Sequence, residues 1–401
     1  MDEGLLPMTI HSKPERANAR STTAVRAGID FDTAHRAVVP PITLSANFRF
    51  TEIGELPAFD YSRSDNPTRA LLADALADLE GGAGGVITAS GMGAVTAVLH
   101  ALLRPGDRLL APRDSYGGSL RLFAALAEKG AFELAICDFT DFGEVAAALE
   151  QKTRLVWIET PSNPLLRITD LQAVSAAARA HGAISVADNT FLSPVLQRPI
   201  EHGVDVVVHS TTKYINGHSD VVGGAVIAAE QGLVDDLGWW ANALGVTGAP
   251  FDSYLTLRGL RTLDARLRVH QENAAVLADI LSRHEAVEQV YYPGLAAHPG
   301  HHIAARQQDG FGAMLSFELK GGEKSVRAFT AGLSFITLAE SLGGVESLVA
   351  HPATMSHAVL SPDDRRRAGI TPGLLRLSVG IEHIRDLSAD LSAALDRASA
   401  C

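Results

Sequence analysis

The sequence predicts an α/β protein with a mostly parallel, seven-stranded sheet and a smaller C-terminal α+β domain. From about residue 85, short apolar segments alternate with helical segments, a pattern typical of parallel sheets covered by helices. Residues 204–209 form a β-branched run that is too short for a helix and fits a strand buried on both faces. The alternation ends near residue 263, where a long helical segment over 263–281 leads out of the domain.

The individual elements follow from the same patterns. Strands are expected at residues 85–89, 108–111, 133–137, 155–159, 184–187, 204–209 and 224–228. Helices are expected at 71–79, 94–103, 120–129, 144–150 and 171–181. The C-terminal part is expected to hold strands at 313–319 and 374–379 and helices near 326–331 and 387–398. Because ligands bind at the carboxyl ends of parallel strands, the polar residues that follow the strands are the candidates for function.

Three regions result from this organisation. Residues 1–69 lack long periodicity and contain turn formers such as Pro40-Pro41, so we expect an extended arm that contacts something outside its own domain. Residues 70–270 are expected to form the ligand-binding α/β domain. Residues 271–401 are expected to form the α+β domain.

Composition excludes several classes of function. The 401 residues carry a formal net charge of −12, so no basic field attracts nucleic acid or an anionic membrane surface. No segment approaches the roughly 18 apolar residues of a membrane span, and residues 1–20 lack the apolar core of a signal peptide. The two cysteines, Cys137 and Cys401, make a disulfide framework implausible, and a cytoplasmic location is expected.

Lys213 is the first candidate for catalysis. The chain contains six lysines, and the other five lie in polar tail, turn or helix-end contexts, whereas Lys213 follows the apolar strand at 204–209. Partial burial lowers the pKa of an ammonium group, which makes Lys213 a candidate amine for Schiff-base chemistry. Ser210 and Thr212 supply hydroxyls beside it, as a phosphate-anchored cofactor requires. A lysine that begins a surface helix is the alternative.

Three further strand ends suit the same cofactor. The small-residue turn at 89–93 joins a strand to a helix, whose N-terminus can receive a phosphate. Asp188 follows the strand at 184–187 and could keep a pyridine nitrogen protonated, although an N-cap role is an alternative. Tyr116 could stack on the ring, or it could be an ordinary half-buried tyrosine. Together with Lys213, these positions indicate pyridoxal 5′-phosphate.

Competing chemistries fit less well. Gly91 and Gly93 lack the third glycine of a dinucleotide-binding turn. Residues 217–221 resemble a nucleophile elbow except at the last position, which is valine rather than glycine. His298, His301 and His302 lack a cysteine or carboxylate at metal-ligand spacing, so no metal site is expected.

Four motifs resemble the Cys/Met-metabolism family of pyridoxal-phosphate enzymes from about Thr23 to the C-terminus. They are Asp-Tyr-Ser-Arg at 60–63, Pro-Ser-Asn-Pro at 161–164, Ser-Thr-Thr-Lys-Tyr-Ile-Asn-Gly-His-Ser-Asp-Val at 210–221 and Leu-Ala-Glu-Ser-Leu-Gly-Gly at 338–344. The resemblance implies the fold of the aspartate aminotransferase-like, pyridoxal-phosphate-dependent transferases.

The resemblance also implies roles for single residues. Lys213 matches the lysine that binds the cofactor covalently and moves protons, Asp188 the partner of the pyridine nitrogen and Tyr116 the residue stacked on the ring. The phosphate would be held by Gly91, Met92, Ser210 and Thr212, and by Tyr61 and Arg63 of a neighbouring subunit. The family usually forms homotetramers built as dimers of active-site-sharing dimers.

Substrate binding is implied in the same way. Arg376 matches the arginine that binds the substrate α-carboxylate, and its planar guanidinium suits a bidentate contact. Asn163, Ser341, Glu340 and Asp60 would line the same pocket, and Arg121 is placed for the distal acyl group.

The reaction expected within the family is γ-replacement. Residues 239–242, 245–248 and 251–254 resemble the branch in which cysteine replaces the acyl group of an O-succinyl- or O-acetylhomoserine, giving cystathionine for methionine biosynthesis. Ser64 resembles the γ-lyase branch instead, because the synthase pattern has a basic residue after Tyr-Ser-Arg. Cystathionine γ-lyase, O-acylhomoserine sulfhydrylase and a non-catalytic binding protein with this fold are the alternatives.

Overall fold

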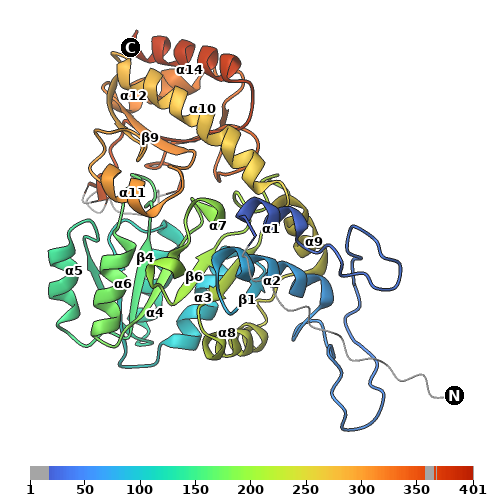
Figure 1. The fold of residues 1–401 in the computed structure, drawn as a ribbon. Helices are drawn as coiled ribbons and strands as arrows, with labels where there is room; N and C mark the ends of the chain where they lie inside the picture. Colours follow the sequence, from blue (N-terminus) through green and yellow to red (C-terminus); the bar gives the residue numbers. More distant parts are fainter. Residues whose placement is uncertain (1–17, 357–364, 367, 401) are drawn as a thin grey trace.

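The computed structural model describes residues 18–356, 365–366 and 368–400, which form two layered domains connected by one long helix (Figure 1). The strands of the first sheet are β1 (Gly84–Thr88), β2 (Arg108–Pro112), β3 (Glu133–Cys137), β4 (Leu155–Glu159), β5 (Ile184–Asp188), β6 (Val206–His209) and β7 (Gly224–Ala228). Their order is β1-β7-β6-β5-β4-β2-β3, and within this sheet only β7 runs antiparallel to its neighbours. The predicted sheet of seven mostly parallel strands is confirmed.

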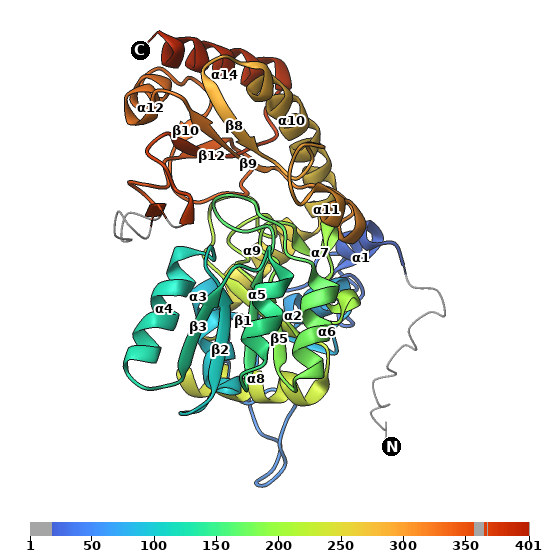
Figure 2. The ribbon, with the colours of Figure 1, turned by 90° about the vertical axis from the view of Figure 1, so that its left-hand side faces the viewer.

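Helices cover both faces of this sheet (Figure 2). The helices of the chain as far as the connecting helix are α1 (Arg20–Arg26), α2 (Pro67–Glu80), α3 (Gly91–Leu102), α4 (Gly117–Glu128), α5 (Phe142–Leu149), α6 (Leu171–Ala180), α7 (Ser193–Leu196), the 3₁₀ helix Pro199–His202, α8 (Gln231–Leu244), α9 (Pro250–Leu260) and α10 (Leu263–Arg283). Alternate residues of a strand point to opposite faces. In β4, Leu155 and Trp157 pack under α3 and α4, whereas Val156 and Ile158 pack under α5 and α6. Burial on both faces explains the nearly continuous apolar strands.

The second domain contains an antiparallel sheet with one parallel pair at its edge. Its strands are β8 (Val287–Tyr291), β9 (Met314–Leu319), β10 (Thr337–Leu338), β11 (Leu348–Ala350) and β12 (Leu374–Ser378), in the order β10-β11-β12-β9-β8. Its helices are α11 (His301–Gln307), α12 (Gly322–Thr330) and α14 (Ile384–Ser399). Helix α10 connects the two domains, and the proposed boundary at residue 270 lies inside it. The domain is the smaller α+β unit that the sequence predicts.

The N-terminal region differs from the expectation at both of its ends. Helix α1 was not predicted, and it buries Ala24 against the core. Helix α2 begins four residues before the predicted start, because the Asn66 side chain accepts hydrogen bonds from the backbone N–H groups of Thr68 and Arg69. Pro67 fits the first helical position, which needs no N–H donor.

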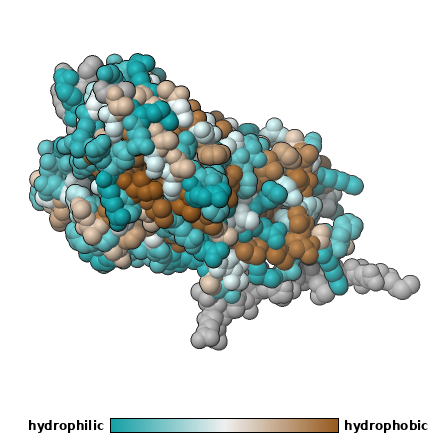
Figure 3. Space-filling view, turned by 90° about the horizontal axis from the view of Figure 1, so that it is seen from above, coloured by the Kyte–Doolittle hydropathy of each residue, from teal (hydrophilic) through white to brown (hydrophobic). Residues whose placement is uncertain are grey.

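Between α1 and α2 the chain forms an arm that projects from the body of the molecule (Figures 1 and 2). Leu44, Ile53 and Leu56 are 68%, 106% and 84% exposed. Apolar residues also reach the surface in patches on the face seen from above (Figure 3). Exposed apolar side chains of this size are typical of protein–protein contacts.

None of the helices in the described residues is long and apolar enough to cross a bilayer.

Candidate active site

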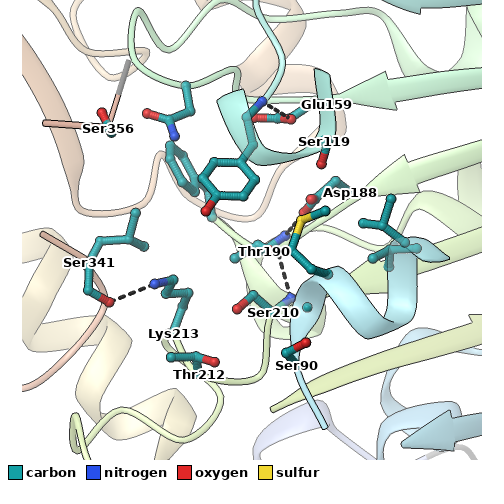
Figure 4. A pocket seen from close by; sticks show the side chains of 18 of the residues that line it. Ser90, Ser119, Glu159, Asp188, Thr190, Ser210, Thr212, Lys213, Ser341 and Ser356 are labelled. Atoms are coloured by element: carbon teal, nitrogen blue, oxygen red, sulfur yellow. Dashed lines mark hydrogen bonds between the residues drawn. The ribbon is translucent and has the colours of Figure 1, made fainter. Parts of the chain in front are cut away.

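A cavity of about 480 Å³ lies where the carboxyl ends of β4, β5 and β6 face the second domain. Figure 4 shows the side chains that line it. Twelve residues singled out from the sequence meet here: Gly91, Met92, Tyr116, Arg121, Asn163, Asp188, Ser210, Thr212, Lys213, Glu340, Ser341 and Arg376. They come from both domains, so the cavity exists only when the two domains are folded together.

One end of the cavity is suited to an anion. Helix α3 begins at Gly91, and the Ser90 hydroxyl caps it by accepting a hydrogen bond from the Gly93 N–H. A Cβ on Gly91 would lie 2.9 Å from the Ser210 Cβ, so only glycine lets the helix start approach the loop after β6 this closely. Free N–H groups at the helix start and the Ser210 hydroxyl then face the same space, and Thr212 lines it with a hydroxyl that bonds the Gly223 backbone.

Lys213 directly follows Thr212 in the chain and lines the same cavity. Its Nζ donates a 2.6 Å hydrogen bond to the Ser341 hydroxyl of the second domain (Figure 4). Burial and, to a lesser extent, the nearby Arg376 charge lower the pKa of Lys213 to about 8, against the opposing effect of Glu340. A larger fraction of the amine is therefore neutral and nucleophilic near pH 8 than for an exposed lysine.

Asp188 ends β5 and faces the cavity. Its Oδ1 accepts a 3.0 Å hydrogen bond from the Thr190 N–H, but Asp188 is not the N-cap of the next helix, which is Leu192. Burial raises the pKa of this carboxyl, while hydrogen bonds from Thr190 and the nearby His209 lower it. Thr190 was missed in the sequence, and its hydroxyl accepts a hydrogen bond from the Ser210 N–H, which joins the ends of β5 and β6.

Tyr116 lies at the mouth of the cavity, directly before α4, and is 41% exposed. Its backbone N–H donates a 2.7 Å hydrogen bond to Oε2 of Glu159, a second residue that the sequence analysis missed. Glu159 is the last residue of the otherwise apolar strand β4, and this position was the available signal.

Arg376 enters the cavity from β12 of the second domain. It is 4% exposed, and it donates hydrogen bonds to Asn163 Oδ1 at 2.8 Å and to the Ser341 carbonyl at 3.0 Å. Its Nε is buried without a partner among the described residues. A buried cation with an unused donor is suited to a carboxylate ligand.

Three predicted residues do not line the cavity. Asp60, Tyr61 and Arg63 lie on the projecting arm, and Arg63 donates a 2.6 Å hydrogen bond to Asn242 Oδ1 in its own chain. Within one chain the structure therefore does not bring the arm to the site.

Two of the three histidines considered for a metal have structural partners. The His298 ring accepts a hydrogen bond from the Gly300 N–H, and His301 bonds the Pro293 carbonyl and stacks on Phe311. No group of three or more metal-ligating side chains was found in the described part of the chain.

Comparison with known proteins identifies the family. The family described as "Cys/Met metabolism PLP-dependent enzyme" matches residues 21–396. The chain belongs to this family. Pyridoxal phosphate is its cofactor, and the expected transferase fold is confirmed by a cystathionine γ-synthase structure from Xanthomonas oryzae pv. oryzae, in complex with aminoacrylate and cysteine. That structure is 64% identical, has a TM-score of 0.94, and the match covers 95% of this chain and 98% of that one.

Proteins similar to this chain catalyse different reactions. Cystathionine γ-synthase of Escherichia coli (strain K12) is 54% identical, with 93% of this chain and 96% of the relative covered. Cystathionine β-lyase of Coxiella burnetii is 46% identical, with 93% and 97% covered. The β-lyase reaction was not among the alternatives weighed from the sequence. The family assignment therefore supports pyridoxal-phosphate-dependent transsulfuration as the general chemistry.

The cavity fits this cofactor. The close approach of Gly91 to Ser210 leaves a cradle of N–H and hydroxyl donors for the phosphate. Among the described residues Lys213 is the one lysine that lines the cavity, and its lowered pKa suits covalent attachment to an aldehyde. Asp188 supplies the carboxyl that a pyridine nitrogen requires.

The lowered pKa of Lys213 leads to a testable pH dependence. Below its pKa the amine is protonated and cannot attack an aldehyde, so capture of pyridoxal phosphate by the cofactor-free protein should rise with pH. We expect a midpoint of about 8 rather than 10.5, measured by borohydride reduction at each pH and normalised to a free lysine derivative. A midpoint equal to that of the free derivative would contradict the assignment.

Proposed function

We propose that this enzyme is a cystathionine γ-synthase, which replaces the acyl group of O-succinyl- or O-acetylhomoserine by cysteine to give cystathionine. The observation that carries this proposal is the sequence identity to solved structures. The chain is 64–65% identical to the Xanthomonas synthase structures and 41% identical to a γ-lyase structure from Lactobacillus plantarum. A second guanidinium, Arg121, lines the same cavity as Arg376. A substrate with two carboxylates, such as the succinyl ester, matches both.

The proposed roles of the residues follow from their positions. Pyridoxal phosphate, when bound, withdraws electrons from the substrate Cα. Arg376 would hold the α-carboxylate, and Asp188 would keep the proton on the ring nitrogen. Lys213 would take the proton from Cα, with its Nζ steered by the Ser341 hydroxyl. A second proton then leaves Cβ, and the γ C–O bond breaks with loss of the acyl carboxylate. The cysteine thiolate forms the new C–S bond at Cγ, and protons return to Cβ and Cα.

Product analysis tests this proposal. Purified enzyme should form cystathionine from O-succinyl- or O-acetylhomoserine plus cysteine, with kcat/KM at least about tenfold above that for cleavage of cystathionine. Each ester is assayed separately, which also reports the acyl preference. Faster formation of cysteine from cystathionine would indicate the γ-lyase favoured by Ser64. Faster formation of homocysteine would indicate the β-lyase when it comes from cystathionine, or the sulfhydrylase when it comes from ester and sulfide.

We also propose that the active site is shared between subunits of a homotetramer. Tyr61 and Arg63 are exposed on a projecting arm and line no part of the cavity of their own chain. The exposed apolar residues of the same arm need a covering surface. An arm that crosses to a neighbouring subunit satisfies both, and it would bring Tyr61 and Arg63 to that neighbour's phosphate site.

Complementation tests the shared site. Lys213→Ala and Arg63→Ala variants are each expected to be nearly inactive, because one lacks the amine and the other a phosphate contact. Subunits mixed by reversible dissociation should regain about a quarter of wild-type activity, because half of the dimers are mixed and each has one intact site. Mixing Lys213→Ala with itself is the control. No recovery after proven subunit exchange would place Arg63 in the site of its own chain.

A further inference from the structure

Two acidic side chains lie next to each other at the floor of the cavity. Strands β4 and β5 are parallel and in register, with Glu159 opposite Asp188, and each residue is the last of its strand. Both side chains line the cavity, and Figure 4 shows them on the same side of it. Two neighbouring carboxylates repel each other, which favours a proton on one of them.

The surroundings show which carboxyl holds it. Glu159 is 6% exposed, and no cationic side chain of the described residues lies within ion-pair distance of it. Its charged neighbours are Asp188 and Asp114, and Asp114 is itself paired with Arg167. Burial raises the pKa of Glu159 well above its usual range, and the Asp188 charge raises it further. Burial raises the pKa of Asp188 as well, but hydrogen bonds from Thr190 and the nearby His209 oppose that rise.

Glu159 is also the main anchor of the loop that carries Tyr116. Its Oε2 accepts the Tyr116 N–H at 2.7 Å, and its carboxyl also accepts the Asn163 N–H. The Tyr116 side chain makes no capping hydrogen bond to α4. Its ring lies over Gly118, where an added Cβ would be 2.4 Å from the ring. The backbone bond to Glu159 and this glycine contact therefore set the position of the ring.

We propose that Glu159 is a positioning residue that acts as a neutral acid. It holds the Tyr116 loop against the cofactor ring, while Asp188 carries the negative charge at the floor of the cavity. The inference rests on the proposed contacts of Tyr116 and Asp188 with the ring. It is independent of which transsulfuration reaction the enzyme catalyses.

Three substitutions separate a neutral acid from a charged one. Glu159→Gln keeps the length and an acceptor oxygen without a charge, Glu159→Asp keeps the acid but withdraws it from the Tyr116 N–H, and Glu159→Ala removes both. Using the holoenzyme without substrate, we measure the rate of pyridoxal phosphate release and the circular dichroism of the cofactor band. Release should be about tenfold or more faster from Glu159→Asp and Glu159→Ala than from Glu159→Gln. The reverse order, with aspartate better than glutamine, would overturn the proposal.

A double-mutant cycle tests whether Glu159 acts through Tyr116. In a Tyr116→Ala background, Glu159→Ala should change cofactor release by about twofold or less, because the ring it positions is already gone. Additive effects would instead mean that Glu159 acts on the general fold. Thermal unfolding of the cofactor-free variants measures any change in the stability of the fold. If the wild-type protein bound no cofactor, the inference would be refuted. A lyase product would refute only the proposed function.

Discussion

Replacement of Lys213 by alanine should lower turnover by at least about 10³-fold, because the substitution removes the proposed nucleophile and proton carrier together. The Lys213 amine is half-buried and donates to Ser341, and its pKa of about 8 is set mainly by burial. The variant should also lose the absorbance of covalently bound cofactor and the adduct that borohydride reduction traps. Both are measured on the purified protein with added pyridoxal phosphate.

Lys320→Ala is the matched control for this experiment. Lys320 is an exposed lysine that directly follows the last residue of β9, and it does not line the cavity. Its loss should therefore leave turnover and absorbance within about twofold of the wild type. If Lys213→Ala kept the visible absorbance and turned over substrate, the amine would be a structural lysine and the interpretation of the cavity would be wrong.

Much of the first domain follows from simple sequence patterns. The strand at 155–159 is predictable because it is buried on both faces and so carries apolar residues at nearly every position. A polar side chain directly after such a strand marks the carboxyl edge of the sheet, which is how Lys213 and Asp188 were found. Glu159 was missed because it belongs to the strand itself, where a charged residue looks like a boundary.

Long-range contacts explain what sequence patterns did not give. Arg376 and Asn163 are 213 residues apart and meet only because the second domain packs over the strand ends. The periodicity of apolar residues along a segment does not predict such a contact, and only the family resemblance singled out Arg376. The arm residues have the same limitation, since the neighbouring subunit in which we propose that they act leaves no signal in the sequence around them. The charged residue within the buried strand Leu374–Ser378 was the one available signal for Arg376.

Arg376 is the second position where a substitution should have a large effect. Replacing it with alanine should lower kcat/KM by about 10²- to 10³-fold, because the substrate carboxylate loses a buried, charge-assisted contact. The guanidinium is buried, and its Nε has no partner in the described residues, so a donor is available for the ligand. Burial also lowers the pKa of Arg376 to about 10, which still leaves it charged at neutral pH. Steady-state kinetics with the homoserine ester gives the measurement.

Arg376→Lys separates charge from shape. Lysine keeps the positive charge, but it cannot bond Asn163, the Ser341 carbonyl and a carboxylate together, so we expect at least a tenfold loss in kcat/KM. Cofactor absorbance should stay close to that of the wild type in both variants, because Arg376 comes from the second domain and donates its hydrogen bonds to Asn163 and Ser341 rather than to Asp188. A variant that lost cofactor and substrate binding together would show instead that Arg376 holds the two domains in register. In that case the unpartnered Nε would be a consequence of domain packing rather than a donor that binds a carboxylate.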